Sequence, residues 1–165
     1  MTKPDKQAFL RLVKQHGGLM QKVVRLYVDD ADDRQDMLQE ILLQAWRSYP
    51  SFRGNSQFST WLYRVSLNTV LTALRKNKRK PETTSLEVAA QLESGTKEHT
   101  EKEWLYKTIR QLPEIDRMII SLHLDGYPNE EIADITGMQK GNVALKLHRI
   151  KKKLTEKAKV YEGLA

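Results

Sequence analysis

The chain has 165 residues and no cysteine, and its 28 Lys and Arg exceed its 21 Asp and Glu, for a formal net charge of +7. The lack of cysteine excludes a disulfide framework, a thiolate nucleophile and a cysteine-ligated zinc site. The apolar runs span only a few residues, far fewer than the roughly 20 that cross a bilayer, and the first residues lack the apolar core of a signal sequence. We therefore expect a cytoplasmic protein that does not insert directly into a membrane.

The net charge is distributed unevenly along the chain. Residues 1–80 carry a net +8, residues 81–98 a net −3 and residues 99–165 a net +2. The acidic middle also collects Pro, Ser, Thr and Gly and has no aromatic residue, a composition typical of a linker. We predict two small domains, over 1–80 and 100–165, joined by a flexible acidic linker over 81–99.

The fold class is expected to be all-α, because neither half has the evenly spaced alternating runs of a sheet protein. In the first half, residues 5–28 are expected to form two helices that break at Gly17 and Gly18. Apolar residues from Met37 to Trp46 then recur at three- and four-residue spacing, which indicates an amphipathic helix.

Asp32 and Asp33 precede these apolar residues and are the expected N-caps of that helix. A loop rich in Pro, Gly, Asn and Ser over 50–56 leads into a second long helix, which we expect over 57–76. Pro and Gly residues divide the second half of the chain. The helices expected there cover 101–111, 114–124, 129–136 and 139–159.

The last two of these helices carry the most specific local pattern in the chain. Ala133, Gly137 and Val143 have the spacing of a helix-turn-helix motif, in which Ala lets two helices cross closely, Gly forms a left-handed turn and Val fills the angle between the helices. The outer face of the last helix carries donors suited to phosphates and base edges in a major groove. These donors are Lys140, Asn142, Lys146, Arg149, Lys151 and Lys153. The alternative is a plain antiparallel helix pair with a solvated basic face.

The first half offers a second candidate nucleic-acid surface. Phe52, Trp61 and Tyr63 lie near several Arg and Lys residues in the sequence, a mixture of stacking surfaces and cations that can hold unstacked single-stranded bases. Against this, aromatic residues at helical spacing most often belong to a core, which is the favoured interpretation of Trp46 and Trp61. The basic run over 75–80 is equally consistent with a solvated helix end.

Segments in both halves resemble bacterial sigma factors of the extracytoplasmic-function (ECF) group. Residues 33–46, 51–54 and 58–68 resemble sigma region 2. Residues 112–114 and 126–133, continuing to Val143 and Arg149, resemble region 4. The resemblance covers nearly the whole chain except the linker and the tail, and it implies a region 2 helical bundle followed by a region 4 helix-turn-helix.

For region 2 the resemblance implies two kinds of contact. Asp36, Gln39 and Glu40 would bind the clamp helices of the RNA polymerase β′ subunit, although the residues alone favour a solvated acidic face. Other residues would hold melted DNA of the minus-ten element and capture a flipped base of its non-template strand. The residues implied in this minus-ten contact are Phe52, Arg53, Arg64, Asn68, Arg75 and Lys76.

For region 4 the resemblance implies binding to duplex DNA of the minus-thirty-five element and to the flap of the polymerase β subunit. The implied DNA contacts are Lys140, Asn142, Lys146, Arg149 and Lys151. The family commonly has Lys or Arg and then Ser directly after the Val of the motif, whereas this chain has Ala144 and Leu145. Two polar contacts are therefore missing, and Leu145 is expected to contact a thymine methyl group or a partner protein.

The resemblance thus implies a transcription initiation factor that binds core RNA polymerase, directs it to promoters and aids promoter melting, with an anti-sigma factor as a further partner. The acidic linker would lie in the RNA-exit path of the polymerase. No enzyme activity, cofactor or metal site is expected, because the His residues show no paired ligand spacing and the acidic cluster at 29–33 lacks the Gly and distal Glu of a calcium loop. The alternative is a two-domain helix-turn-helix regulator without polymerase-core function, although residues 1–80 show neither an effector pocket nor a phosphoacceptor.

Overall fold

The structure is a computed structural model that describes residues 4–78 and 97–163, and these residues form helices and turns without any strand. The prediction of an all-α fold is confirmed. The chain divides into an N-terminal unit, Met1–Glu93, and a C-terminal unit, Ser94–Ala165. Most of the predicted linker, residues 81–96, lies outside the described residues. Within residues 4–78 and 97–163, every helix is too short or too polar to span a bilayer.

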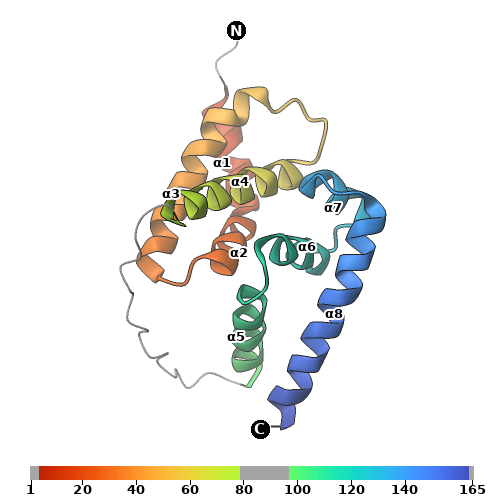
Figure 1. Ribbon diagram of the computed structural model, residues 1–165. Coiled ribbons are helices and arrows are strands. Elements are labelled where there is room, and N and C mark those ends of the chain that lie inside the picture. The colour runs from red at the N-terminus through yellow and green to blue at the C-terminus, as the bar shows by residue number, and fades with distance from the viewer. Residues whose placement is uncertain (1–3, 79–96, 164–165) are drawn as a thin grey trace. The chain divides into compact units, whose positions relative to one another are not determined.

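The N-terminal unit is a helical bundle (Figure 1). Its elements are α1 (Lys6–Gln15), α2 (Gly17–Tyr27), α3 (Ala31–Ser48), the 3-10 turn η1 (Tyr49–Ser51) and α4 (Phe58–Lys78). α2 packs against α3 and α4, and α3 packs against α4. Val23, Ile41 and Leu62 are among the fully buried side chains that these three helices contribute to the core. Because burial of such a side chain contributes about 1.5–3 kcal/mol, this core fixes which faces of α3 and α4 remain exposed.

α1 and α2 are separate helices, as expected, but the break lies at His16 rather than at the two glycines. The His16 N–H donates to the carbonyls of Leu12 and Val13, and α2 begins at the next residue. Gly17 and Gly18 do not have a positive φ and lie in the first turn of α2. Glycine weakens a helix, so these residues favour a boundary here without forming the turn themselves.

The N-cap of α3 is Asp30, so the prediction of Asp32 and Asp33 as N-caps is wrong. The Asp30 carboxylate accepts hydrogen bonds from the backbone N–H groups of Asp32 and Asp33, at 2.9 and 3.1 Å. Asp30 has the extended backbone of an N-cap, whereas Asp32 and Asp33 already belong to the first helical turn. Their negative charges are favourable there because they lie at the positive end of the helix dipole. Arg34 Nε donates to the Val28 carbonyl at 2.7 Å and so secures the connection from α2.

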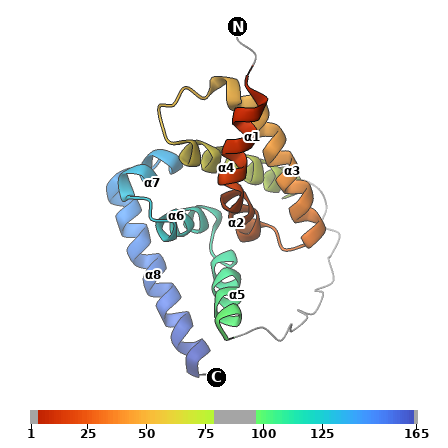
Figure 2. The same cartoon turned by 180° about the vertical axis from the view of Figure 1, so that it is seen from behind.

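The C-terminal unit contains four helices within the described residues (Figure 2). They are α5 (Lys97–Arg110), α6 (Glu114–Leu124), α7 (Asn129–Thr136) and α8 (Lys140–Gly163). α6 packs against α7 and α8, and α7 packs against α8. α5 starts earlier and α8 ends later than expected by a few residues, while α6 and α7 match the expected ranges. The ring of Trp104 on α5 stacks on that of Tyr161 on α8, with centroids 4.9 Å apart.

α7, the turn after it and the start of α8 form the predicted helix-turn-helix motif. Gly137 ends α7 with φ 73° and ψ 16°, a left-handed conformation that glycine adopts without strain. The N–H groups of Gly137 and Met138 both donate to the Ala133 carbonyl, which closes the turn. Ala133 is buried and Val143 is completely buried. The three positions of the motif therefore have the structural roles that their spacing predicts.

We expect Gly137→Ala to destabilise the C-terminal unit, because an L side chain in the left-handed region costs roughly 1–2 kcal/mol. The measurement is the urea midpoint of unfolding, followed by circular dichroism. Gly141→Ala is the matched control, since Gly141 lies in the first turn of α8 without a positive φ and a Cβ there meets nothing within 4 Å. An equal loss of stability in both variants would contradict the role assigned to the turn.

Candidate nucleic-acid interface

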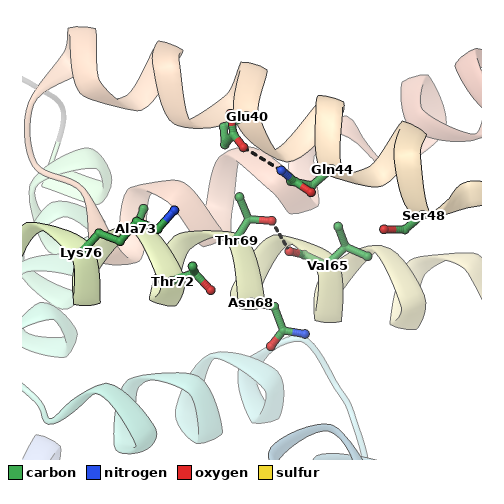
Figure 3. Close-up of a pocket in the computed structure, with 9 residues that line it drawn as sticks. All are labelled: Glu40, Gln44, Ser48, Val65, Asn68, Thr69, Thr72, Ala73 and Lys76. Atoms are coloured by element: carbon green, nitrogen blue, oxygen red, sulfur yellow. Dashed lines mark hydrogen bonds between the residues drawn. The ribbon is translucent and has the colours of Figure 1, made fainter.

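A groove of about 420 Å³ lies between α3 and α4 in the N-terminal unit (Figure 3). α3 contributes Glu40, Gln44 and Ser48, whose four-residue spacing places them on one face of the helix. α4 contributes Val65, Asn68, Thr69, Thr72, Ala73 and Lys76. Hydroxyl, amide and charged groups therefore line both walls of the groove.

Three of the predicted site residues meet in this groove. Glu40 was expected to contact polymerase, and Asn68 and Lys76 were expected to contact DNA. The Glu40 carboxylate accepts a hydrogen bond from Gln44 Nε2 at 2.8 Å, which holds it along the wall formed by α3. The groove is therefore a surface on which the predicted polymerase contact and the predicted DNA contact adjoin.

Four polar residues of the groove were not predicted from the sequence. They are Gln44, Ser48, Thr69 and Thr72. The Thr69 hydroxyl donates to the Val65 carbonyl at 2.7 Å, which orients its side chain. Three of these four residues could have been predicted from the helical period. Gln44 and Ser48 follow Glu40, and Thr72 follows Asn68, at four-residue intervals, which place them on the same helix faces.

Phe52 does not line the groove but belongs to an aromatic cluster. Its ring centroid lies 5.2 Å from that of Trp61, 5.7 Å from that of Phe58 and 6.4 Å from that of Tyr49. Trp46 joins the cluster by stacking on Tyr49, also at 6.4 Å. Phe52, Trp46 and Trp61 are half-buried. The packing of the two Trp rings therefore favours the core interpretation, while Phe52 keeps part of its ring accessible.

The four cations predicted to bind minus-ten DNA differ in exposure. Arg53, Arg75 and Lys76 are exposed, whereas Arg64 is half-buried. Arg64 Nε is the one buried side-chain nitrogen or oxygen in the described ranges without a hydrogen-bond partner. A buried donor left unpaired costs about 1–3 kcal/mol, so a phosphate contact by Arg64 would have to use its other guanidinium nitrogens. Tyr63 is fully buried and is therefore removed from any stacking surface.

Asp36, Gln39 and Glu40 form an exposed strip on α3. Their three- and four-residue spacing places them on one face of the helix. Ile41 and Ala45 are completely buried on the opposite side. The core packing of α3 therefore leaves this acidic and polar strip accessible to a partner.

The five predicted minus-thirty-five contacts lie on α8, and two of them are ion-paired within the unit. Lys140 Nζ lies 2.6 Å from the Glu130 carboxylate of α7, and these side chains are 61% and 73% exposed. The hydrogen bond from Lys140 lowers the pKa of Glu130. Lys146 Nζ lies 2.9 Å from the Asp116 carboxylate of α6, with exposures of 36% and 18%. Asn142, Arg149 and Lys151 are exposed.

A hollow of about 450 Å³ lies beside the Asp116–Lys146 pair. Its lining residues are Asp116, Lys146, Arg149, Ile150, Lys152, Lys153 and Glu156. Ala144 and Leu145 are also exposed on α8. No group of three acidic or His side chains in the described part of the chain could hold a metal ion. The polar surface of α8 is therefore predominantly cationic, and cations of this kind hold phosphate groups.

Comparison with known proteins identifies both units. Residues 12–80 match the family model of sigma-70 region 2, and residues 102–154 match that of sigma-70 region 4. The ECF RNA polymerase sigma-E factor of Escherichia coli K12 is 35% identical over 172 residues, covering 95% of this chain and 90% of the relative. The factor of the same name from Haemophilus influenzae is 33% identical, covering 93% of this chain and 88% of the relative.

Two solved structures share the fold. CnrH in complex with the cytosolic domain of CnrY matches with a TM-score of 0.71 and 21% identity, covering 95% of this chain and 91% of that one. The sigma factor RpoE in complex with the anti-sigma factor NepR from Bartonella quintana matches with a TM-score of 0.68 and 23% identity, covering 96% of this chain and 99% of that one. The two matched regions and the sigma-E relatives place the chain in the ECF group of sigma-70 family sigma factors.

Proposed function

We propose that this chain is a transcription initiation factor that binds core RNA polymerase and directs it to specific promoters. The observation that carries the proposal is the presence of region 2 and region 4, in that order, in one chain that aligns over 95% of its length with an RNA polymerase sigma factor. In this proposal the protein acts by binding, without a catalytic step or a cofactor, and it is located in the cytoplasm.

The N-terminal unit is proposed to hold melted minus-ten DNA against α4. Asn68 is exposed in the α3–α4 groove, and its amide can both donate and accept hydrogen bonds with an extruded base. Arg53, Arg64, Arg75 and Lys76 are proposed to hold the phosphate backbone. Phe52 is proposed to offer its accessible edge to the base, supported from behind by Trp61 and Phe58.

The C-terminal unit is proposed to bind the minus-thirty-five element as duplex DNA. A helix-turn-helix presents its second helix to the major groove, where Lys and Arg reach phosphates and base edges and Asn reads adenine. Lys140, Asn142, Lys146, Arg149 and Lys151 are the proposed contacts. Leu145 is 50% exposed on the same helix, which supports an apolar contact there.

Core polymerase is the proposed protein partner of both units. The acidic strip of Asp36, Gln39 and Glu40 is proposed to bind the β′ clamp helices, and the C-terminal unit the β flap. An anti-sigma factor is a further proposed partner, supported by the solved complex of the sigma factor RpoE with NepR. The acidic linker predicted over 81–99, most of which lies outside the described residues, is proposed to occupy the RNA-exit path.

Run-off transcription with purified core polymerase on genomic fragments tests the proposal. We expect the chain to confer transcription from particular fragments that core polymerase alone does not transcribe. A helix-turn-helix regulator without polymerase-core function could bind DNA but could not confer this specificity. Failure to confer initiation on any fragment, while DNA binding persists, would favour that alternative.

Asn68→Ala is expected to reduce run-off from the selected promoters by about tenfold, because loss of a hydrogen-bonded base contact costs about 1–3 kcal/mol. The defect should shrink on templates already melted over the minus-ten element, where extrusion of the base needs less energy. Asn77→Ala is the matched control, since Asn77 is also exposed on α4 but does not line the groove. Equal activity of the two variants would remove Asn68 from the proposed site.

Simultaneous Asp36→Ala and Gln39→Ala substitutions are expected to weaken core-polymerase binding by about tenfold, because both side chains belong to the exposed strip of α3 and contacts of this kind are worth about 1–2 kcal/mol together. Titration of labelled protein with core polymerase measures the effect. Gln21→Ala is the control, an exposed polar side chain on α2 and therefore outside the strip. If only the control weakened binding, the assignment of the polymerase contact would be wrong.

A further inference from the structure

Lys146 is the least exposed of the proposed minus-thirty-five contacts. The other four, Lys140, Asn142, Arg149 and Lys151, are exposed, while Lys146 is half-buried. Lys146 directly precedes Leu147, which with Val143 and Ile150 makes the buried stripe of α8. Its position at the edge of that stripe directs its stem along the protein surface toward α6, where its ammonium group meets Asp116.

The position of Asp116 stabilises its ion pair with Lys146. Asp116 lies in the first turn of α6, where the helix dipole favours a negative charge. The distance from Lys146 Nζ to its Oδ1 is 2.9 Å, and the Asp116 side chain is only 18% exposed. Salt screens such a partly buried pair less than it screens a pair on the surface. A phosphate approaching from solvent must therefore displace a carboxylate that is already in contact.

The side chains around the Asp116–Lys146 pair are mostly cationic, so a DNA phosphate would compete with Asp116 for Lys146. The hollow beside it is lined by four cations, Lys146, Arg149, Lys152 and Lys153, and by two carboxylates, Asp116 and Glu156. An excess of cations around a hollow attracts phosphate groups. Asp116 is the carboxylate bound to a proposed DNA contact at this place, so it stands where a phosphate would otherwise neutralise Lys146.

We infer that Asp116 sets the affinity of the C-terminal unit for duplex DNA by withholding Lys146 from the phosphate backbone. The inference rests on the proposed function, since it concerns the same minus-thirty-five contact. Lys140 provides the contrast within the same helix. Its pair with Glu130 is exposed on both sides, and a pair of that kind contributes little in water. Lys140 is therefore open to a phosphate, whereas Lys146 can bind one only by leaving Asp116.

The test measures how DNA affinity depends on salt. The slope of log K against log salt is negative, and each phosphate neutralised by a cation makes it steeper by about 0.9. Asp116→Asn removes the competing charge and nearly preserves the shape of the side chain. We expect it to free Lys146 for phosphate, steepening that slope by up to about 0.9 and tightening binding about three- to tenfold at low salt.

The experiment uses the full chain assembled with core polymerase and a labelled duplex carrying the upstream segment of a promoter selected by run-off. Binding is titrated at salt concentrations between about 50 and 200 mM. Asp116→Asn is compared in the wild-type background and in a Lys146→Gln background. Glu130→Gln is the matched control, because it removes a carboxylate from an exposed pair on the same surface. Circular dichroism confirms that each variant is folded.

The inference is supported if Asp116→Asn makes the slope steeper only while Lys146 is present and Glu130→Gln leaves it unchanged. It is overturned if Asp116→Asn weakens binding, leaves the slope unchanged, steepens it equally in the Lys146→Gln background, or acts no differently from Glu130→Gln. These outcomes all require salt-dependent binding by the wild type. If the wild type showed neither salt-dependent DNA binding nor run-off activity, the proposed function itself would be wrong.

Discussion

The burial of one apolar stripe on each helix is the constraint on which every candidate surface of this protein depends. Small helical units bury a limited fraction of their surface, so α3, α4 and α8 must each commit one face fully to the core. Ile41 on α3, Leu62 on α4 and Val143 on α8 are completely buried. The faces left over carry the polar strip of α3, the groove between α3 and α4, and the cations of α8. Core packing therefore determines the direction in which each proposed contact points.

Some of the cations on these exposed faces are paired with carboxylates of neighbouring helices. The C-terminal unit has nearly balanced charges in its sequence, yet its cations concentrate on α8. Glu130 on α7 and Asp116 on α6 each form an ion pair with a lysine of that helix, Lys140 and Lys146 respectively. The two ion pairs have similar lengths, but their different exposure gives them different physical weight, because water and salt screen the Glu130–Lys140 pair far more. Counting charges on a recognition helix without their burial would treat these lysines as equivalent.

Features encoded within a few residues could be predicted from the sequence. The helical stripes predicted the fold class, and Ala133, Gly137 and Val143 predicted the helix-turn-helix, because each depends on a short spacing. The N-cap of α3 was missed because four Asp residues crowd its start and only backbone conformation selects Asp30. The Asp116–Lys146 pair joins residues far apart in the chain, and no local pattern encodes it. The packing of Phe52 against Trp61 likewise depends on how a loop folds over α4.

Two apolar positions on α8 give the Asp116–Lys146 pair additional weight. Ala144 and Leu145 are exposed on this helix, and neither can bind a phosphate through its side chain. The polar contacts of the helix therefore depend on a smaller set of side chains, of which Lys146 is one. Withholding one contact from a short list changes a larger share of the total salt-dependent binding than withholding it from a long one. A DNA-binding helix with few polar contacts is thus more sensitive to a single carboxylate on the helix that supports it.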